Sequence, residues 1–138
     1  MQPVPYLFFH TDARAAFETY GRIFGATPEI MGFDALPDAE GAGMPGVPAD
    51  VVMHAALRVG DGWIYGSDDP SRESARMAGC NVHVEFGTEA ETRRVWDGLA
   101  EAGEVRMPLA ETFWAPLFGA LTDRFGIRWM ISQAGPQS

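Results

Sequence analysis

The sequence predicts an α+β fold in which two β-α-β-β-β modules form curved mixed sheets around a cleft for a small molecule. Strand, helix, strand and strand hairpin follow one another in the same order in both halves. Each predicted helix is followed by a glycine, Gly25 or Gly103, and each hairpin has a glycine in its turn, Gly62 or Gly126. Neither half can bury both its helix and its sheet alone, so residues 1–138 are expected to form one domain.

The first module is expected over about residues 3–68. Four strands are predicted in it: Val4–His10, Thr27–Phe33, Val51–Val59 and Trp63–Ser67. Asp12 is expected to cap a helix that runs to Phe24 and ends before Gly25. Apolar residues recur along this helix at spacings of three and four, as in a helix with one buried face: Ala13, Ala16, Phe17, Tyr20, Ile23 and Phe24.

Two segments lack the periodicity of a helix or a strand. Residues 34–50 carry three glycines and three prolines, and a loop of this length is either a functional lid or simply mobile. Residues 69–79 are polar and are expected to link the modules. At the start of this linker, Asp68 and Asp69 are interpreted as a solvated charge pair in a turn.

The second module is expected over about residues 80–134. Four strands are predicted: Asn81–Phe86, Val105–Met107, Trp114–Leu121 and Ile127–Ser132. Thr88 and Glu91 have the spacing of a capping box and predict a helix that runs to Ala102 and ends before Gly103. Alternation along the last strand places Trp129 in the core beneath this helix.

The composition excludes several classes of partner. The formal net charge is −9, and all ten basic residues are arginines. An acidic surface repels nucleic acid and anionic membranes, and a chain without lysine cannot form a Schiff base. Cys80 is the only cysteine, which suits a reducing compartment. With no signal-peptide pattern and no apolar run of about 20 residues, a cytoplasmic, soluble protein is expected.

Three stretches of sequence carry a family resemblance. The first is Pro5–Phe9, which leads to Ala16–Tyr20 and Ile23–Gly25. The second is Met53–Asp61, together with Ser67 and Asp68. The third is C-terminal and consists of five residue pairs: Phe113-Trp114, Phe118-Gly119, Thr122-Asp123, Phe125-Gly126 and Arg128-Trp129. On these residues the chain resembles the vicinal oxygen chelate superfamily (glyoxalase/bleomycin resistance/dioxygenase), and within it the PhnB-like branch. The match covers nearly the whole chain, and its C-terminal part is the most specific.

Some PhnB-like proteins are described as ubiquinone methyltransferases. A nucleotide-type cofactor site calls for a glycine-rich loop after the first strand of a parallel sheet. The first predicted strand is followed instead by Thr11 and Asp12. The sequence therefore does not predict methyl transfer, and whether the chain is an enzyme is left open.

The resemblance implies a divalent metal held by His or Glu side chains on strands facing the cleft. The equivalent positions fall at four residues of this chain: Pro5, Gly66, Asn81 and Met130. None of these side chains is a good ligand for such a cation. No metal and no other cofactor is therefore predicted at the usual site.

His83 and Glu85 are the candidate catalytic residues. With Asn81 they alternate along one strand and so project from one face. The pair would bind a metal at a rearranged site or act as general base and acid. The alternative interpretation is an ordinary polar contact for His83 and a solvated strand end for Glu85.

The candidate ligand pocket combines aromatic and polar residues: Phe9, Tyr65, Ser67, Asn81, His83, Glu85, Trp114, Phe118, Arg128 and Met130. Trp114 and Phe118 would form an apolar wall with Phe9, unless they serve only packing. Arg128 would attract a carboxylate or phosphate, unless it pairs with one of the many acids. Cys80 has no nearby base and is interpreted as buried and inert.

Three functions fit these observations. The first is a metal-free protein that binds a small, partly apolar molecule. The second is a metal-dependent isomerase, dioxygenase or transferase that uses His83 and Glu85. The third is a structural or regulatory dimer whose cleft is filled by its own side chains. A homodimer is expected in each case, because the resemblance implies sheet edges covered by a second chain.

Overall fold

The computed structural model describes residues 1–32, 51–70 and 77–135. The chain divides into two compact units, Met1–Ala75 and Arg76–Ser138, and each is described by itself. The boundary between the units falls within the predicted linker, residues 69–79. The predicted lid or mobile loop, residues 34–50, lies outside the described residues.

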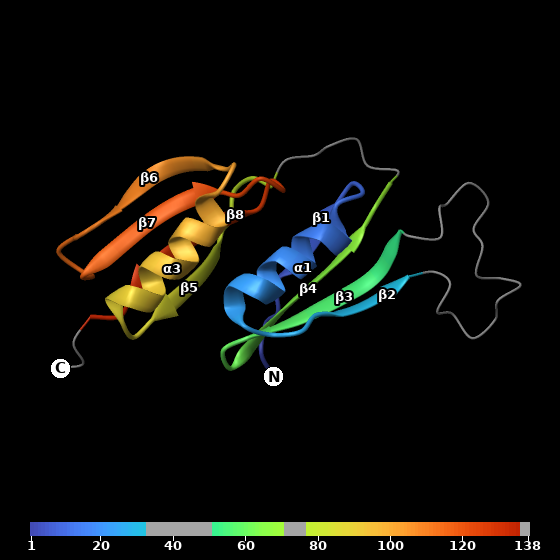
Figure 1. The fold of residues 1–138 in the computed structure, drawn as a ribbon, viewed down its shortest axis with the longest axis horizontal. Coiled ribbons are helices and arrows are strands. Elements are labelled where there is room, and N and C mark those ends of the chain that lie inside the picture. The colour runs from blue at the N-terminus through green and yellow to red at the C-terminus, as the bar shows by residue number, and fades with distance from the viewer. Residues whose placement is uncertain (33–50, 71–76, 136–138) are drawn as a thin grey trace, which may run out of the picture. The chain divides into compact units, whose positions relative to one another are not determined.

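The first unit is a four-stranded mixed sheet with one helix against one face (Figure 1). Its elements in chain order are β1 (Tyr6–Phe9), α1 (Ala13–Phe24), β2 (Glu29–Gly32), β3 (Val52–Val59) and β4 (Gly62–Asp68). The strand order is β1-β4-β3-β2, in which β1 runs parallel to β4 and the other neighbours are antiparallel.

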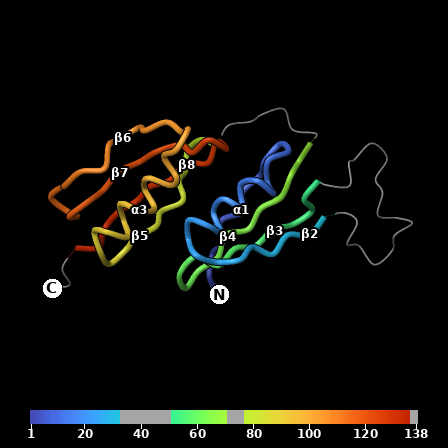
Figure 2. The backbone as a smooth tube through the Cα atoms, viewed as in Figure 1, coloured from blue at the N-terminus to red at the C-terminus, as the bar shows by residue number. Residues whose placement is uncertain are grey.

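The second unit repeats this plan, as the path of the backbone shows (Figure 2). Its elements are β5 (Val82–Phe86), α3 (Glu89–Ala100), β6 (Glu104–Ala110), β7 (Leu117–Thr122) and β8 (Arg128–Gln133). The strand order is β5-β8-β7-β6, with β5 parallel to β8. The predicted α+β class with two β-α-β-β-β modules is confirmed.

The core of the first unit lies between α1 and one face of its sheet. Leu7 and Phe9 of β1 point into it, and Phe17 and Tyr20 of α1 are fully buried. The rings of Phe9 and Phe17 meet edge to face with centroids 6.2 Å apart. The expectation that Phe9 lines the pocket was therefore wrong, because its ring packs beneath the helix.

The core of the second unit is built in the same way beneath α3. Trp129 is fully buried, as are Ile131 and Val95, which confirms the predicted placement of Trp129. Its indole Nε1 donates a 2.9 Å hydrogen bond to Oδ2 of Asp123. The buried aromatic ring thus brings its one polar atom to a carboxylate.

The predicted start of α1 needs a correction. The helix begins at Ala13, but the side chain of Asp12 makes no capping bond. Asp68, at the end of β4, accepts a bond from the Ala13 amide through Oδ1 and from the Val52 amide through Oδ2, both at 2.9 Å. Asp68 is therefore a structural clasp between the helix, β3 and β4, and not half of a solvated charge pair.

The other predicted helix ends agree with the structure in part. Gly25 adopts a left-handed conformation after α1, with φ 72°, and the Thr88 hydroxyl accepts a 3.2 Å bond from the Glu91 amide at the start of α3. After α3, however, the left-handed residue is Ala102, with φ 58°. Gly103 is needed for another reason, since a Cβ there would lie 2.5 Å from the Thr122 carbonyl oxygen.

Replacing Asp68 by alanine is expected to lower the free energy of unfolding by about 1–3 kcal/mol, because two amides lose their acceptor. Urea denaturation followed by circular dichroism measures the change. Asp12→Ala serves as the control, because the exposed Asp12 side chain makes no capping bond, and it is expected to change the free energy of unfolding by less than about 0.5 kcal/mol. Equal effects of the two substitutions would contradict the clasp.

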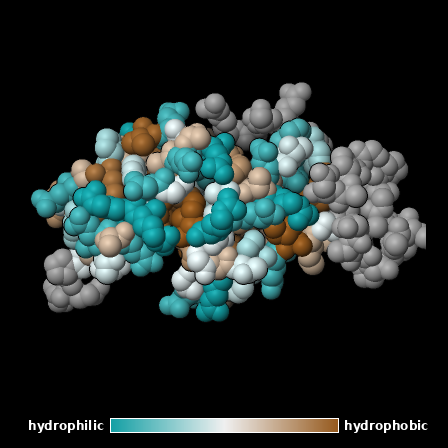
Figure 3. Space-filling model, viewed as in Figure 1, coloured by the Kyte–Doolittle hydropathy of each residue, from teal (hydrophilic) through white to brown (hydrophobic). Residues whose placement is uncertain are grey.

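Polar residues cover much of the face seen in Figure 3, where hydrophobic residues gather only in small separate patches. The outer side of α3 is an example, with an ion pair of 2.9 Å between Arg93 and Glu89. Among the described residues, no helix has both the length and the apolar character needed to cross a membrane.

Candidate functional site

Five ring-bearing side chains gather on the face of the first sheet that α1 does not cover. We call them the aromatic face: Tyr6, Phe8, His54, Trp63 and Tyr65. The strand register explains the grouping, because Tyr6 lies opposite Tyr65, and Leu7, the next residue of β1, points to the helix instead. Tyr65 therefore lies on the face that α1 does not cover, and the strand register brings side chains of β1, β3 and β4 together there.

The rings of the aromatic face touch one another rather than standing singly. The centroid of Tyr6 lies 5.2 Å from Phe8, 5.7 Å from His54 and 6.4 Å from Tyr65. The Tyr6 hydroxyl and the Nδ1 of His54 share a hydrogen bond of 3.2 Å. Phe8 is 51% exposed and Tyr6 is 42% exposed, so the face presents ring surface with polar atoms beside it.

Ser67 belongs to the same side of β4 but is not available as predicted. It lies opposite Phe8 in the register of β1 and β4, and it is buried. Its hydroxyl therefore contributes less to an open surface than the sequence led us to expect.

His83 and Glu85 lie on the helix-free face of the second sheet, as their alternation predicted. Both are exposed. The Nε2 of His83 is hydrogen-bonded to the Ser132 hydroxyl at 2.8 Å. Because Ser132 is only 2% exposed, this pair is a fixed contact within the sheet and not an open nucleophile with its base.

Trp114 and Phe118 are in contact, with ring centroids 5.3 Å apart. Phe118 lies in β7 and is buried, whereas Trp114 precedes the strand and is 54% exposed. Phe113 adds a third ring, 4.7 Å from Trp114 and almost fully exposed. Phe9, their expected partner in a pocket wall, belongs to the core of the other unit.

Arg106 and Arg128 form a second polar feature on this helix-free face, which we call the arginine pair. The Nε of Arg106 donates to the Thr122 hydroxyl at 3.2 Å, and Thr122 lies opposite Arg128 in the register of β7 and β8. Burial lowers the pKa of the Arg106 guanidinium, the charge of Arg128 lowers it further, and Glu104 partly offsets both.

Asn81 and Cys80 hold the arginine pair from the β5 side. The Oδ1 of Asn81 accepts a 2.7 Å bond from Nη2 of Arg106. The carbonyl oxygen of Cys80 accepts a 3.2 Å bond from Nε of Arg128. The thiol of Cys80 is free and the residue is exposed, so the interpretation of Cys80 as buried was wrong.

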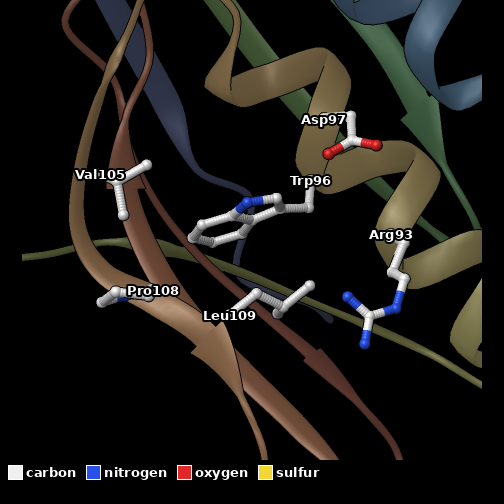
Figure 4. A pocket seen from close by; sticks show the side chains of 6 residues that line it. All are labelled: Arg93, Trp96, Asp97, Val105, Pro108 and Leu109. Atoms are coloured by element: carbon white, nitrogen blue, oxygen red, sulfur yellow. The ribbon is translucent and has the colours of Figure 1, made fainter.

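A pocket of about 340 Å³ lies elsewhere, between α3 and the edge strand β6. Figure 4 shows the Trp96 indole lying in it, with Arg93 and Asp97 from the same helix and three apolar side chains from the strand: Val105, Pro108 and Leu109. The indole rests on Gly119, where a Cβ would come within 2.7 Å of the ring. None of the predicted site residues lines this pocket.

The comparisons with known proteins agree with this architecture. A family model described as 3-demethylubiquinone-9 3-methyltransferase matches residues 2–132. The chain belongs to this family. Protein YjdN of Escherichia coli (strain K12) is 31% identical over 137 residues, which cover 93% of this chain and 92% of YjdN. The crystal structure of PA1353 from Pseudomonas aeruginosa, with 39% identity and a TM-score of 0.85, covers 97% and 98% of the two chains.

More distant structures show the fold alone. The PhnB protein from Bacillus cereus has a TM-score of 0.79 at 24% identity and covers 97% of this chain and 100% of its own. A glyoxalase/bleomycin resistance protein/dioxygenase family enzyme from Burkholderia phytofirmans PsJN has a TM-score of 0.61 at 14% identity, with the same coverage. These structures confirm the fold implied by the resemblance to the vicinal oxygen chelate superfamily, and the comparisons fit the PhnB-like branch within it.

The residues at the four positions implied for a metal make other contacts in this protein. The carbonyl oxygen of Pro5 accepts a bond from the Tyr65 amide, Gly66 faces Phe17 of the helix, and Asn81 is bonded to Arg106. Met130 lies on the helix-free face opposite His83. Within residues 1–32, 51–70 and 77–135, no group of three or more His, Cys, Asp and Glu residues is placed to hold a metal.

The sequence missed Arg106 and most of the aromatic face. Alternation from Val105, whose partner Leu121 is buried beneath α3, would have placed Arg106 on the helix-free face. Tyr6 and Phe8 gave no such signal, because β1 reads Tyr-Leu-Phe-Phe and is apolar on both sides.

Proposed function

We propose that this protein binds a small, partly apolar molecule on the helix-free side of its sheets. The observation that carries the proposal is the aromatic face of the first unit. Ligand pockets are lined mostly by apolar and aromatic side chains, with a few polar groups that set orientation. On this face Tyr6 and His54 would supply those polar groups, and Phe8 would supply the most open ring.

Ring surface of this kind gains free energy when a flat apolar ligand displaces water from it. Burial contributes roughly 25 cal/mol for each Å² of apolar surface removed from water. Aromatic pairs in offset or edge-to-face contact add about 0.5–1.5 kcal/mol beyond that. The rings already contact one another. Their side chains therefore lose little conformational freedom when a ligand binds.

The family description names a substituted quinone as a substrate, and a quinone ring has the size and flatness that this face favours. Methyl transfer is not part of the proposal. The described residues form two β-α-β-β-β modules, and the loop after β1 lacks the glycines that a dinucleotide-type cofactor site uses.

The proposed binding needs no metal. The predicted loss of the usual ion site stays part of the proposal, supported by the side chains at Pro5, Gly66, Asn81 and Met130. A stoichiometric zinc, nickel, manganese or iron in protein purified without added metal, lost in His83→Ala, would contradict this part and favour the rearranged His83 and Glu85 site.

Titration with 2-naphthol tests the proposal, because this probe is uncharged, flat and partly apolar. We expect saturable binding, measured by isothermal titration calorimetry, and at least a fivefold weaker affinity for Phe8→Ala. One contacting ring contributes about 1 kcal/mol in aromatic pairs, which corresponds to that factor.

Phe113→Ala is the matched control, since it removes another exposed phenylalanine from the second unit. We expect it to leave the naphthol affinity unchanged. No saturable binding, or the same loss in both variants, would overturn the proposal and leave the structural or regulatory dimer as the better account.

Homodimerisation, a cytoplasmic location and the lack of nucleic-acid and membrane partners stay predictions of the sequence. Light scattering after gel filtration measures the first of these directly.

A further inference from the structure

Arg106 and Arg128 lie near each other, and neither has a carboxylate partner among the residues that the structure describes. Within the described parts of the chain, neither guanidinium forms an ion pair. This is notable because the chain has 19 acidic residues against 10 basic ones. Glu104 is near enough to act on Arg106 electrostatically, yet it forms no ion pair with it.

We propose that the arginine pair binds the oxyanion of a small molecule, a carboxylate or a phosphate, on the helix-free face of the second unit. The arginine pair belongs to the second unit and the aromatic face to the first, and the inference does not depend on the proposed function. Guanidinium groups suit it because they present N–H donors in a planar fork that matches both anions.

Arg106 is held in position before any anion arrives. Its Nη2 donates to Asn81 Oδ1 at 2.7 Å and to the Leu121 carbonyl at 2.9 Å, and its Nε donates to Thr122. Its Nη1 donates to no residue in the described ranges. A side chain already fixed in this way loses little conformational freedom when it binds, which lowers the cost of recognition.

Arg128 completes the site with a more open group. Its Nε donates to the Cys80 carbonyl, whereas its two terminal nitrogens donate to no described residue. Like charges brought together on a partly buried surface repel each other, and an anion between them replaces that repulsion with two attractions. The terminal N–H donors of Arg128 and the positive charge of the arginine pair therefore both favour an anion as the ligand.

The neighbouring side chains indicate what the rest of the ligand is like. Next to the pair formed by Thr122 and Arg128, the strands place Ala120 opposite Met130 on the same face. Both are apolar, so an anion carrying an apolar group gains contacts that a free inorganic ion lacks. Benzoate and inorganic phosphate are the two probes that separate these cases.

The experiment is calorimetric titration of the full chain with sodium benzoate and with inorganic phosphate, at low and constant ionic strength because salt screens such contacts. We expect saturable binding of at least one probe and at least a tenfold weaker affinity in Arg128→Gln. Tighter benzoate binding assigns the site to a carboxylate with an apolar group, and tighter phosphate binding assigns it to a phosphoryl group.

Arg14→Gln is the matched control, because Arg14 is an exposed arginine on α1 of the other unit. Arg106→Gln is expected to abolish binding, but it also removes several internal bonds, so Arg128→Gln is the decisive variant. Binding of neither probe, or an equal loss in Arg14→Gln and Arg128→Gln, would overturn the inference. Anion binding without naphthol binding would support it while the proposed function fails.

Discussion

Asp123→Ala is expected to lower the free energy of unfolding by about 3–5 kcal/mol, because it leaves three N–H donors without their acceptor. The carboxylate accepts bonds from the Phe125 and Ile127 amides through Oδ1, at 2.8 and 3.0 Å. Its Oδ2 accepts the bond from the indole of Trp129. Asp123 is 6% exposed, so water cannot replace these bonds without opening the hairpin between β7 and β8.

Urea denaturation followed by tryptophan fluorescence and circular dichroism measures the effect. Asp97→Ala is the control in the same unit, since Asp97 is exposed on α3, and we expect it to change the free energy of unfolding by less than about 0.5 kcal/mol. A loss below about 1 kcal/mol in Asp123→Ala would show that the three bonds contribute little net stability.

A double-mutant cycle separates the indole bond from the two amide bonds. Trp129→Phe removes the Nε1 donor but keeps a large aromatic ring in the core. If the contact between Asp123 and Trp129 is as close as its 2.9 Å distance indicates, the two substitutions should couple by about 0.5–3 kcal/mol, as contacting residues do.

The elements that the sequence predicted correctly are those with a local cause. Gly25 ends α1 because glycine accepts a left-handed conformation at no steric cost, and Thr88 starts α3 through its own hydroxyl. Trp129 was placed in the core by its alternation with Arg128, Met130 and Ser132 along one strand. In each case the deciding signal lies within a few residues along the chain.

The predictions that failed depend on partners far apart in the sequence. The amide of Ala13 finds its acceptor at Asp68, 55 residues away, whereas local sequence pointed to the adjacent Asp12. Phe9 and Phe8 are adjacent and equally apolar, and only the packing of α1 decides which one is buried. Arg106 reaches Asn81 across 25 residues, and strand pairing alone brings them together.

The same distinction applies to function. The residues that the family resemblance singles out, such as Gly66 and Met130, are poor ligands for a metal. The features that support the proposed binding are the aromatic face and the arginine pair. Both are assembled by strand register, from β1, β3 and β4 in one unit and from β6 and β8 in the other. Sequence spacing therefore locates the strands but does not identify the surface that they build.

Gly66→Ala is expected to lower the free energy of unfolding by about 2–3 kcal/mol, at the upper end of what overpacking a core usually costs. A Cβ at this position would lie 2.7 Å from Cε1 of Phe17 and 2.8 Å from the carbonyl oxygen of Leu7. Phe17 is fully buried between α1 and the sheet, so its ring has no room to move aside. Thermal unfolding followed by circular dichroism measures the change.

Gly62→Ala is the matched control, because it lies in the same strand and the nearest atom to its Cβ would be 3.7 Å away. We expect that variant to unfold close to the wild type. Phe17→Leu in the Gly66→Ala background should restore part of the lost stability by making space on the helix side, while the approach to Leu7 of β1 remains. If Gly66→Ala is as stable as Gly62→Ala, then α1 does not press on β4 at this point, and the assignment of Gly66 to the helix-covered face fails with it.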